Sequence, residues 1–213
     1  MSALAAFRVS ILALLSDAGL AIFSNNDVDQ ALRWALSEYS SRRPLIRTYQ
    51  FPVAATTGVH ILPADFITRH VTNVELYDDD PDSIYDLTYY AYQRDEQWIV
   101  ETRSAEGPGT LREVSAGEVL QISYSVIHTI DDLDSAAGTT LPAADEPFIH
   151  VGAAGRAAQM RALDRIETIN MNPDVVQMYK LLATEYLSSF AAFLTIEPGV
   201  HFCLPDFPSV DQF

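Results

Sequence analysis

The sequence predicts an α+β fold in which a helical bundle is interrupted by an inserted antiparallel β-domain. Apolar residues recur at helical spacing near both ends of the chain, in residues 3–43 and 142–194. Residues 45–127 between them are rich in β-branched and aromatic residues and are broken up by proline and glycine. Residues 198–213 contain too many prolines, over too short a length, to form a core. We therefore expect them to be an extended C-terminal tail.

Residues 1–44 predict two N-terminal helices. The first covers residues 3–15, and Phe7, Ile11 and Leu14 lie on one of its faces. The second begins near Asn26 or Asp27, either of which could cap free backbone N–H groups, and it ends before proline 44. The apolar run in the first helix is much shorter than the ~18–20 residues of a membrane span, and it lacks the charge pattern of a signal peptide. An amphipathic helix is therefore the better interpretation.

Residues 45–127 predict a β insertion domain of five to six antiparallel strands, arranged as a small sandwich or a barrel-like sheet. The expected strands are residues 45–51, 58–63, 71–77, 84–92, 97–102 and 119–127. Arg94–Glu96 is expected to be the turn of a hairpin.

Residues 128–197 predict a C-terminal helical hairpin that packs with residues 1–44. Its first helix is expected to start at Pro142–Glu146, behind Thr139 or Thr140, and to end near residue 169. Its expected apolar stripe is Ile149, Ala153, Ala157, Met160, Leu163 and Ile166. Gly152 and Gly155 lower the helix propensity but would let another backbone approach closely. A short connection to the next helix, residues 174–194, makes the two helices antiparallel neighbours.

The chain is strongly acidic. With 13 Lys+Arg against 29 Asp+Glu, the formal net charge of the 213 residues is −16. This charge argues against tight wrapping of nucleic acid and against binding to an anionic membrane. It suits either ordinary solubility or a surface that DNA passes without sticking. The one cysteine, Cys203, excludes an intrachain disulfide, which is typical of a cytoplasmic or virion protein.

No motif predicts catalysis, a cofactor or a metal. The acidic run Asp78–Asp82 has alternate carboxylates, but Ser83 and Tyr89 stand where a calcium loop needs glycine and glutamate. We interpret it, and Asp131–Asp134, as solvated turns. There is no phosphate loop or nucleophile elbow, and the histidines lack metal-ligand spacing. We expect the protein not to be an enzyme.

Two groups of residues are candidates for protein contacts. Four apolar residues of the tail could anchor an arm in a neighbouring subunit or a partner, at ~2–3 kcal/mol for each buried aromatic side chain, or could lie on the protein's own surface. They are Phe202, Leu204, Phe207 and Phe213. A second group on the helical hairpin is predicted to form contacts between subunits. It consists of Arg156, Arg161, Arg165, Tyr179 and Tyr186.

The order of elements resembles the head–tail connector (adaptor) proteins of tailed bacteriophages, most specifically in residues 27–43 and 124–167. The resemblance implies a structural virion protein that is made in the host cytoplasm and located in the virion neck. It implies a homo-oligomeric ring, commonly dodecameric, under the portal, with double-stranded DNA passing through its lumen. The implied partners are the portal protein, which the tail would bind, and the next neck or tail component. The family has no catalytic residues and no cofactor.

Two alternatives remain open. The β insertion is larger than in purely helical adaptors, which favours another neck position, such as a stopper, gatekeeper or tail-completion protein. A different class is a non-catalytic module that binds a sugar or a protein through exposed tyrosines. These are Tyr85, Tyr89, Tyr90 and Tyr92. Adjacent strand residues face opposite ways, so only some of the four can share one platform.

Overall fold

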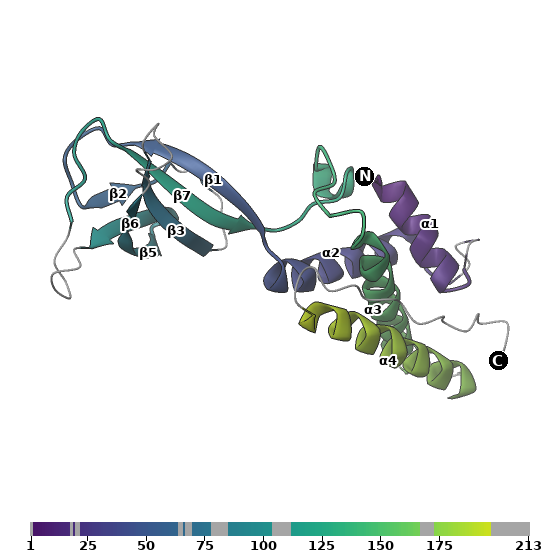
Figure 1. Cartoon of the computed structure of the whole chain (residues 1–213). Helices are drawn as coiled ribbons and strands as arrows, with labels where there is room; N and C mark the ends of the chain where they lie inside the picture. Colours follow the sequence, from purple (N-terminus) through teal and green to yellow (C-terminus); the bar gives the residue numbers. More distant parts are fainter. Residues whose placement is uncertain are drawn as a thin grey trace. The chain divides into compact units, whose positions relative to one another are not determined.

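The structure is a computed structural model of the chain (Figure 1). It describes residues 2–17, 19, 22–63, 66, 70–77, 85–103, 112–166 and 173–196, and only the backbone of residues 85, 86 and 164–166. Two compact units are formed, one by Met1–Pro44 with Ile127–Phe213 and one by Leu45–Val126. The first is helical and the second contains two small antiparallel sheets, so the predicted α+β class is confirmed.

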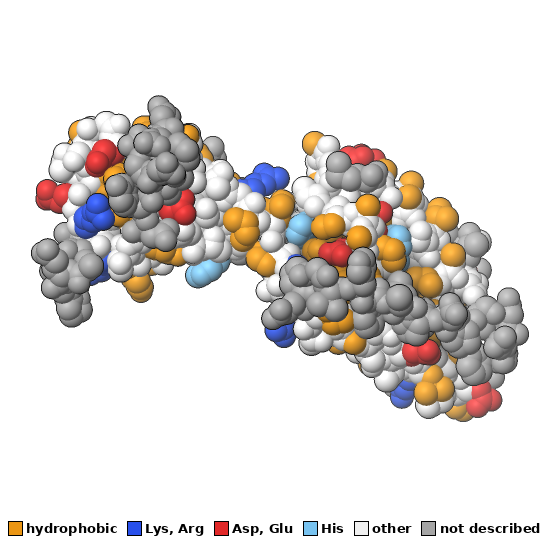
Figure 2. Space-filling model, viewed as in Figure 1, with side chains coloured by type: hydrophobic (Ala, Val, Ile, Leu, Met, Phe, Trp, Pro, Cys, Tyr) orange, Lys and Arg blue, Asp and Glu red, His pale blue; other side chains and the backbone are white. Residues whose placement is uncertain are grey.

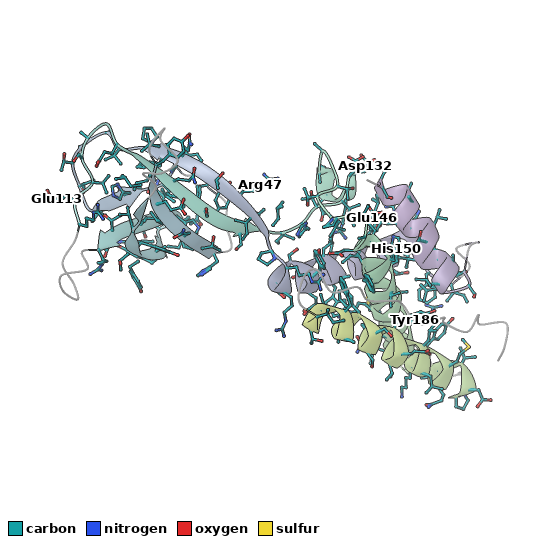
Figure 3. The ribbon with its side chains drawn as sticks, in the orientation of Figure 1. Arg47, Glu113, Asp132, Glu146, His150 and Tyr186 are labelled. Atoms are coloured by element: carbon teal, nitrogen blue, oxygen red, sulfur yellow. The ribbon has the colours of Figure 1, made fainter. Side chains whose placement is uncertain are left out.

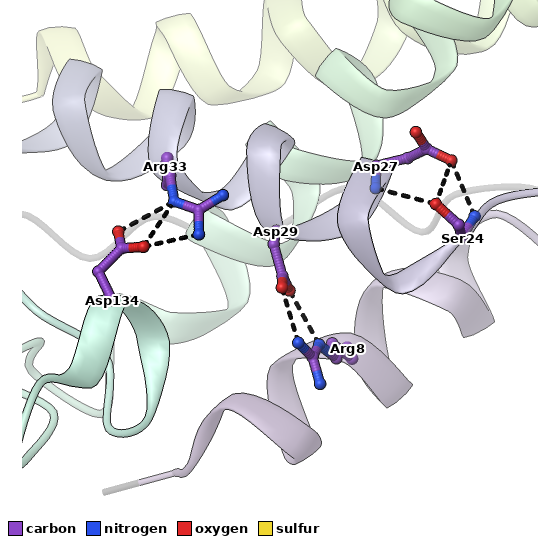
Figure 4. Close-up of polar contacts among 6 residues, drawn as sticks. All are labelled: Arg8, Ser24, Asp27, Asp29, Arg33 and Asp134. Carbon is purple, nitrogen blue, oxygen red and sulfur yellow. Dashed lines mark hydrogen bonds and ion pairs between the residues drawn. The ribbon is translucent and has the colours of Figure 1, made fainter.

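The N-terminal helices are α1 (Leu4–Leu14) and α2 (Asn25–Arg42). A capping box starts α2: the Ser24 hydroxyl accepts from the Asp27 N–H at 3.3 Å, and the Asp27 carboxylate accepts from the Ser24 N–H at 2.8 Å (Figure 4). The predicted caps, Asn26 and Asp27, were therefore wrong. The cap must have an extended backbone outside the helix, and Ser24 has one, with φ −78° and ψ 161°.

The helical hairpin consists of α3 (Glu146–Ile166) and α4 (Pro173–Thr195). Helix α3 begins at Glu146, the last residue of the predicted start, and the two threonines expected to precede it bind the loop before the helix. The Thr139 hydroxyl donates to the carbonyl of Ser2 at 2.7 Å and accepts from the N–H of Asp131 at 3.0 Å. The Thr140 hydroxyl accepts from the N–H of Thr129 at 2.8 Å. Both side chains therefore fold the loop and do not cap the helix.

Helix α3 packs against α1, α2 and α4, and its surface of small residues makes this possible. A Cβ at Gly152 would lie 2.7 Å from the Phe190 ring, and one at Gly155 would lie 2.9 Å from the Tyr186 Cβ. The predicted close approach is confirmed. The predicted stripe was partly wrong, because Leu163 is 58% exposed. The buried face of α3 is instead dominated by Ala153, Ala154, Ala157, Ala158 and Ala162.

The β unit has two sheets that share one core. The four-stranded sheet has the order β1 (Leu45–Pro52), β7 (Val119–Val126), β3 (His70–Tyr77) and β4 (Tyr85–Asp86). The three-stranded sheet has the order β2 (Val59–Ile61), β6 (Gln97–Arg103) and β5 (Thr88–Arg94). Inner residues of both sheets form the core of a sandwich, including Val74, Val100, Leu120 and Ile122.

Two details of the β unit test the predicted strands. Residues 84–92 were expected to be one strand, but β4 and β5 are separated by Leu87, whose side chain is buried in the core. The predicted hairpin between β5 and β6 is confirmed. Its turn residues Asp95 and Glu96 have φ values of 50° and 64°, which match the right-handed twist of a two-residue hairpin.

The contact of α3 with α4 predicts the effect of Gly155→Ala. The added methyl group would meet the Tyr186 Cβ, which is fixed to the backbone of α4, so the helices must separate. Overpacking of this kind costs ~1–3 kcal/mol, against ~1 kcal/mol gained from the helix propensity of alanine. We expect a net loss of stability in urea unfolding followed by circular dichroism. Gly138→Ala, where no atom lies within 4 Å of the new Cβ, is the matched control and should change little. Equal stability of the two variants would contradict the close contact.

Candidate functional site

The two tyrosines predicted to form subunit contacts point into the helical unit. Tyr186 is 2% exposed, and its hydroxyl donates to the carbonyl of Leu14 at 3.1 Å, which joins α4 to the end of α1 (Figure 3). Burial raises the pKa of this phenol, so it stays neutral. Tyr179 is 5% exposed and meets the Phe23 ring edge-on, with centroids 5.9 Å apart. Both side chains hold the chain's own helices together.

The three predicted arginines of α3 have different surroundings. Arg156 is half-buried, with its guanidinium carbon 5.5 Å from the Trp34 ring centroid and a 2.7 Å hydrogen bond to the Gln159 side chain. The Nε of Arg161 is buried and has no hydrogen-bond partner among the described residues. The side chain of Arg165 lies outside the described residues. Their role between subunits stays a prediction.

Other arginines pair with carboxylates of their own chain. Arg8 binds Asp29 through two parallel hydrogen bonds of 2.8 and 2.6 Å, and Arg33 binds Asp134 at 2.6 Å (Figure 4). The guanidinium of Arg33 lowers the pKa of Asp134. The first pair joins α1 to α2, and the second joins α2 to the loop after residue 130. These contacts stabilise the helical unit.

Phe202, Leu204, Phe207 and Phe213 lie outside the described residues, as do His201, Cys203 and the run Asp78–Asp82. The last described residue before the tail is Ile196, at the end of α4. Its surroundings define where the tail begins.

Arg43 brings the ends of α2 and α4 together at the root of the tail. Its Nη2 donates to the carbonyls of Phe193 and Ile196 at 3.2 and 2.7 Å. Its Nη1 lies 3.5 Å from the Asp145 carboxylate, and its guanidinium carbon lies 4.2 Å from the centroid of the Phe193 ring. A cation at this place complements the dipoles of two helix C-termini. The tail therefore begins at a fixed point.

Aromatic packing supports this ionic contact. The Phe193 ring is stacked on Phe148 with centroids 3.8 Å apart, and the hydroxyl of Tyr39 donates to Asp145 at 2.5 Å. Burial is the largest cause of the raised pKa of Tyr39, followed by the hydrogen bond to Asp145. The helical pattern of residues 27–43 does not single out Arg43. Its position directly before Pro44 and the first strand is the signal that could have identified it as the residue linking the helical unit to the β unit.

His128 connects the two chain segments between the helical unit and the strands. Its ring nitrogens lie 3.1 Å from the carbonyl oxygens of Arg43 and Thr140, and its backbone N–H donates to the Ser40 hydroxyl at 3.0 Å. Arg43 precedes β1 and His128 follows β7. Burial lowers the pKa of His128, despite the opposing effect of the two carbonyls. A neutral ring carries one N–H: with Nε2 donating to the Arg43 carbonyl, Nδ1 can accept from the Thr140 hydroxyl, which lies 3.2 Å away. In this way the ring bridges the two segments.

A groove of about 340 Å³ lies between α2 and the segment that follows β7. Leu36, Ile127 and Leu133 give it an apolar floor, and the ion pair of Arg33 with Asp134 lies at its side. His128 lines it too, but the ring nitrogens face backbone carbonyls. The groove therefore suits an apolar side chain.

The tyrosines of the alternative platform are divided between the two faces of β5. Tyr89 packs on the core of the sandwich, whereas Tyr90 and Tyr92 face outward with ring centroids 5.6 Å apart. The expectation that Tyr89 and Tyr90 point opposite ways is confirmed. The side chain of Tyr85 lies outside the described residues.

The described part of the chain shows neither a cluster of metal ligands nor a membrane-spanning helix. There, no three His, Cys, Asp or Glu side chains gather so that they could hold a metal ion. Nor does any described helix have the length and apolar character needed to span a membrane.

Comparison with known proteins gives a weak likeness among solved structures. No protein-family model matches the chain, and no curated protein does. Among solved structures, the chain is similar to a chain from the neck of an empty GTA particle computed with C6 symmetry. The identity is 15% and the TM-score 0.31, over 83% of this chain and 87% of the other.

The contacts of Arg43 predict that Arg43→Met destabilises the helical unit by about 2–3 kcal/mol, the scale of hydrogen bonds to charged groups. Asp145 would lose its cation, and the carbonyls at the end of α4 would lose their donor. Urea unfolding measures the loss. Arg42→Met is the control, because Arg42 is exposed and has no ion pair among the described residues. The same loss for both variants would show that the junction contacts contribute nothing.

The buried histidines predict a loss of stability below neutral pH. Burial lowers the pKa values of His60, His128 and His150 from the ordinary value of 6.5. Below pH ~6.5 the unfolded chain therefore binds protons that the folded chain does not, and the free energy of unfolding falls with pH. The lowered pKa of Asp134 acts only at much lower pH.

Thermal unfolding between pH 7.5 and pH 5.5, both chosen to bracket a histidine pKa of ~6.5, measures this effect. His60 is 2% exposed and neither ring nitrogen has a partner in the described structure, so His60→Leu should reduce the pH dependence. A melting temperature that is constant over this range would refute the prediction.

Proposed function

We propose that this protein is a head–tail connector (adaptor) of a tailed-phage-like particle, a structural protein without catalytic activity. The observation that carries the proposal is the order of elements. A helical unit made of both ends of the chain holds an inserted β-sandwich, and the chain continues beyond α4 into an apolar segment. The sequence resembles the connector family in this same order.

The fixed root of the tail supports a docking arm. Arg43 holds the end of α4 against α2 and Asp145, so the residues after Ile196 leave from a rigid support. An arm that starts at a rigid point loses less conformational freedom on docking than one that starts on a loose helix. In the proposal, the apolar residues Phe202, Leu204, Phe207 and Phe213 anchor it in the portal.

The charge of the chain supports a DNA passage. In the proposed ring, commonly dodecameric, every copy contributes a net charge of −16, so a lumen lined by carboxylates repels the phosphate backbone. DNA would then pass through without specific binding. The β unit would face the next neck or tail component, and the protein would be located in the neck of the particle. A stopper or gatekeeper position is the alternative within the same proposal.

A non-catalytic binding module is the second candidate, favoured by the outward-facing pair Tyr90 and Tyr92. A module of this kind would be monomeric and would ignore a portal protein. The mass of the purified protein by light scattering, alone and mixed with the portal of its particle, separates the two proposals. A ring or a complex with portal is expected; a monomer in both samples would refute the connector.

The tail gives the sharpest variant. Deletion of residues 200–213 should leave the fold unchanged, because the described core lies before residue 197, and should abolish binding to portal. A full-length control carries serine at Phe202, Leu204, Phe207 and Phe213, which keeps the length and removes the anchors. We expect this variant, like the deletion, to keep the fold and to lose binding to portal. Undiminished portal binding by both variants would exclude the arm.

A further inference from the structure

The two sheets of the β unit have very different outer faces. In the four-stranded sheet, the middle of the outer face is polar, as is usual for an antiparallel sheet with one face in water. It consists of Thr48, Gln50, Asn73, Glu75, Gln121 and Ser123. Several of these side chains bind one another: Glu75 accepts hydrogen bonds from Asn73 at 2.8 Å and from Gln121 at 3.1 Å.

The outer face of the three-stranded sheet is apolar instead. Its strand register aligns Ile61, Ile99 and Tyr92 in one row and Val59, Glu101 and Tyr90 in the next. Ile61 is 56% exposed, Tyr90 58% and Val59 37%. We call Val59, Ile61, Tyr90, Tyr92 and Ile99 the apolar outer face. Figure 2 shows hydrophobic side chains at scattered places on one face of the molecule. The strand register places those of the apolar outer face on three neighbouring strands.

Strand propensity does not explain this face. Threonine also favours strands, and the middle of the other sheet uses threonine, glutamine and serine outward; its exposed Ile46 lies at one end of β1, apart from them. Exposed apolar side chains that adjoin one another across strands are typical of a contact surface. The apolar outer face is therefore expected to be covered by another molecule.

The polar side chains on this face already bind one another, so they offer few hydrogen-bonding groups to a charged or sugar-like ligand. The Glu101 carboxylate accepts from the Tyr92 hydroxyl at 3.0 Å and from the Arg103 guanidinium at 2.5 Å. The charges of Glu101 and Arg103 cancel, so the face is close to neutral and its carboxylate is already engaged. A neutral apolar face of this kind fits an apolar protein surface.

We propose that the apolar outer face is a contact surface between copies of this chain. Each copy has a net charge of −16, so two copies repel one another except where the surfaces that meet carry no net charge. A cationic partner would instead be attracted to acidic parts of the surface. The inference rests on the proposed ring for its setting, and it adds which face of the β unit adjacent copies use.

The size of the face indicates its part in the contact. A stable interface buries roughly 800 Å² on each partner, more than five side chains supply. The apolar outer face would be the dry centre, with the exposed polar residues around it as the rim. Raised salt should strengthen the contact, because it screens the repulsion between copies, and the proposed centre holds no ion pair between one copy and the other for salt to weaken.

The test is the concentration dependence of mass, by sedimentation equilibrium at low and high salt. The double variant Ile61→Thr, Tyr90→Thr keeps strand propensity and removes the two most exposed apolar side chains of the face. We expect it to raise the dissociation constant of self-association about tenfold or more, since central aromatic side chains dominate such contacts. The matched control is Ile46→Thr, Gln50→Thr, two exposed positions on the outer face of the other sheet.

Circular dichroism and thermal unfolding establish that both double variants are folded. Self-association of the Ile61, Tyr90 variant equal to that of the wild type would overturn the inference while leaving the connector proposal intact. A wild type that binds portal but never self-associates would also overturn it alone. A wild type that stays monomeric even with portal would remove both proposals.

Discussion

The close packing of α3 is the constraint on which the helical unit depends. A helix can pack closely against three others only if it has small side chains on several faces. Alanine and glycine residues meet this condition in α3. At Gly152 and Gly155 there is no room for even one more carbon atom. This approach brings α4 near enough for the Tyr186 hydroxyl to reach the end of α1. The glycines that weaken α3 as a helix are thus what allow the bundle to form.

The position of α4 has a consequence at its other end. With α4 held against α3, Phe193 stacks on Phe148 and its carbonyl comes within reach of Arg43. The backbone carbonyl of Arg43 in turn contacts the ring of His128, on the segment that follows β7. One arginine therefore connects the packing of the bundle to the chain segments that enter and leave the inserted unit. The root of the tail shares this support, because the carbonyl of Ile196 binds the same guanidinium.

Sequence periodicity predicted what depends on local pattern. The four helices, the β5–β6 hairpin and the close approach at the α3 glycines were predicted because spacing and turn residues specify them locally. Contacts between distant residues were not predictable in this way. Arg43 and Asp145 are 102 positions apart, and nothing near either residue indicates the other. The same limit applies to Tyr179 and Tyr186, whose burial depends on the residues of α1 and of the α1–α2 loop that they meet. The candidate arm lies outside the described residues and stays a prediction.

The distribution of arginines links charge to assembly. Arg8, Arg33, Arg43 and Arg103 each bind a carboxylate of their own chain, so they fold the protein and are not free to join copies. The cations of this acidic chain are scarce, and each of these pairs also uses one carboxylate, so the surface keeps the net negative charge of the chain. Such a surface repels DNA in the proposed lumen and equally repels a second copy. Repulsion between copies is least where uncharged surface meets, and the neutral outer face of β2, β6 and β5 provides such a surface. The charge that would suit DNA passage thus favours assembly through uncharged, apolar contacts.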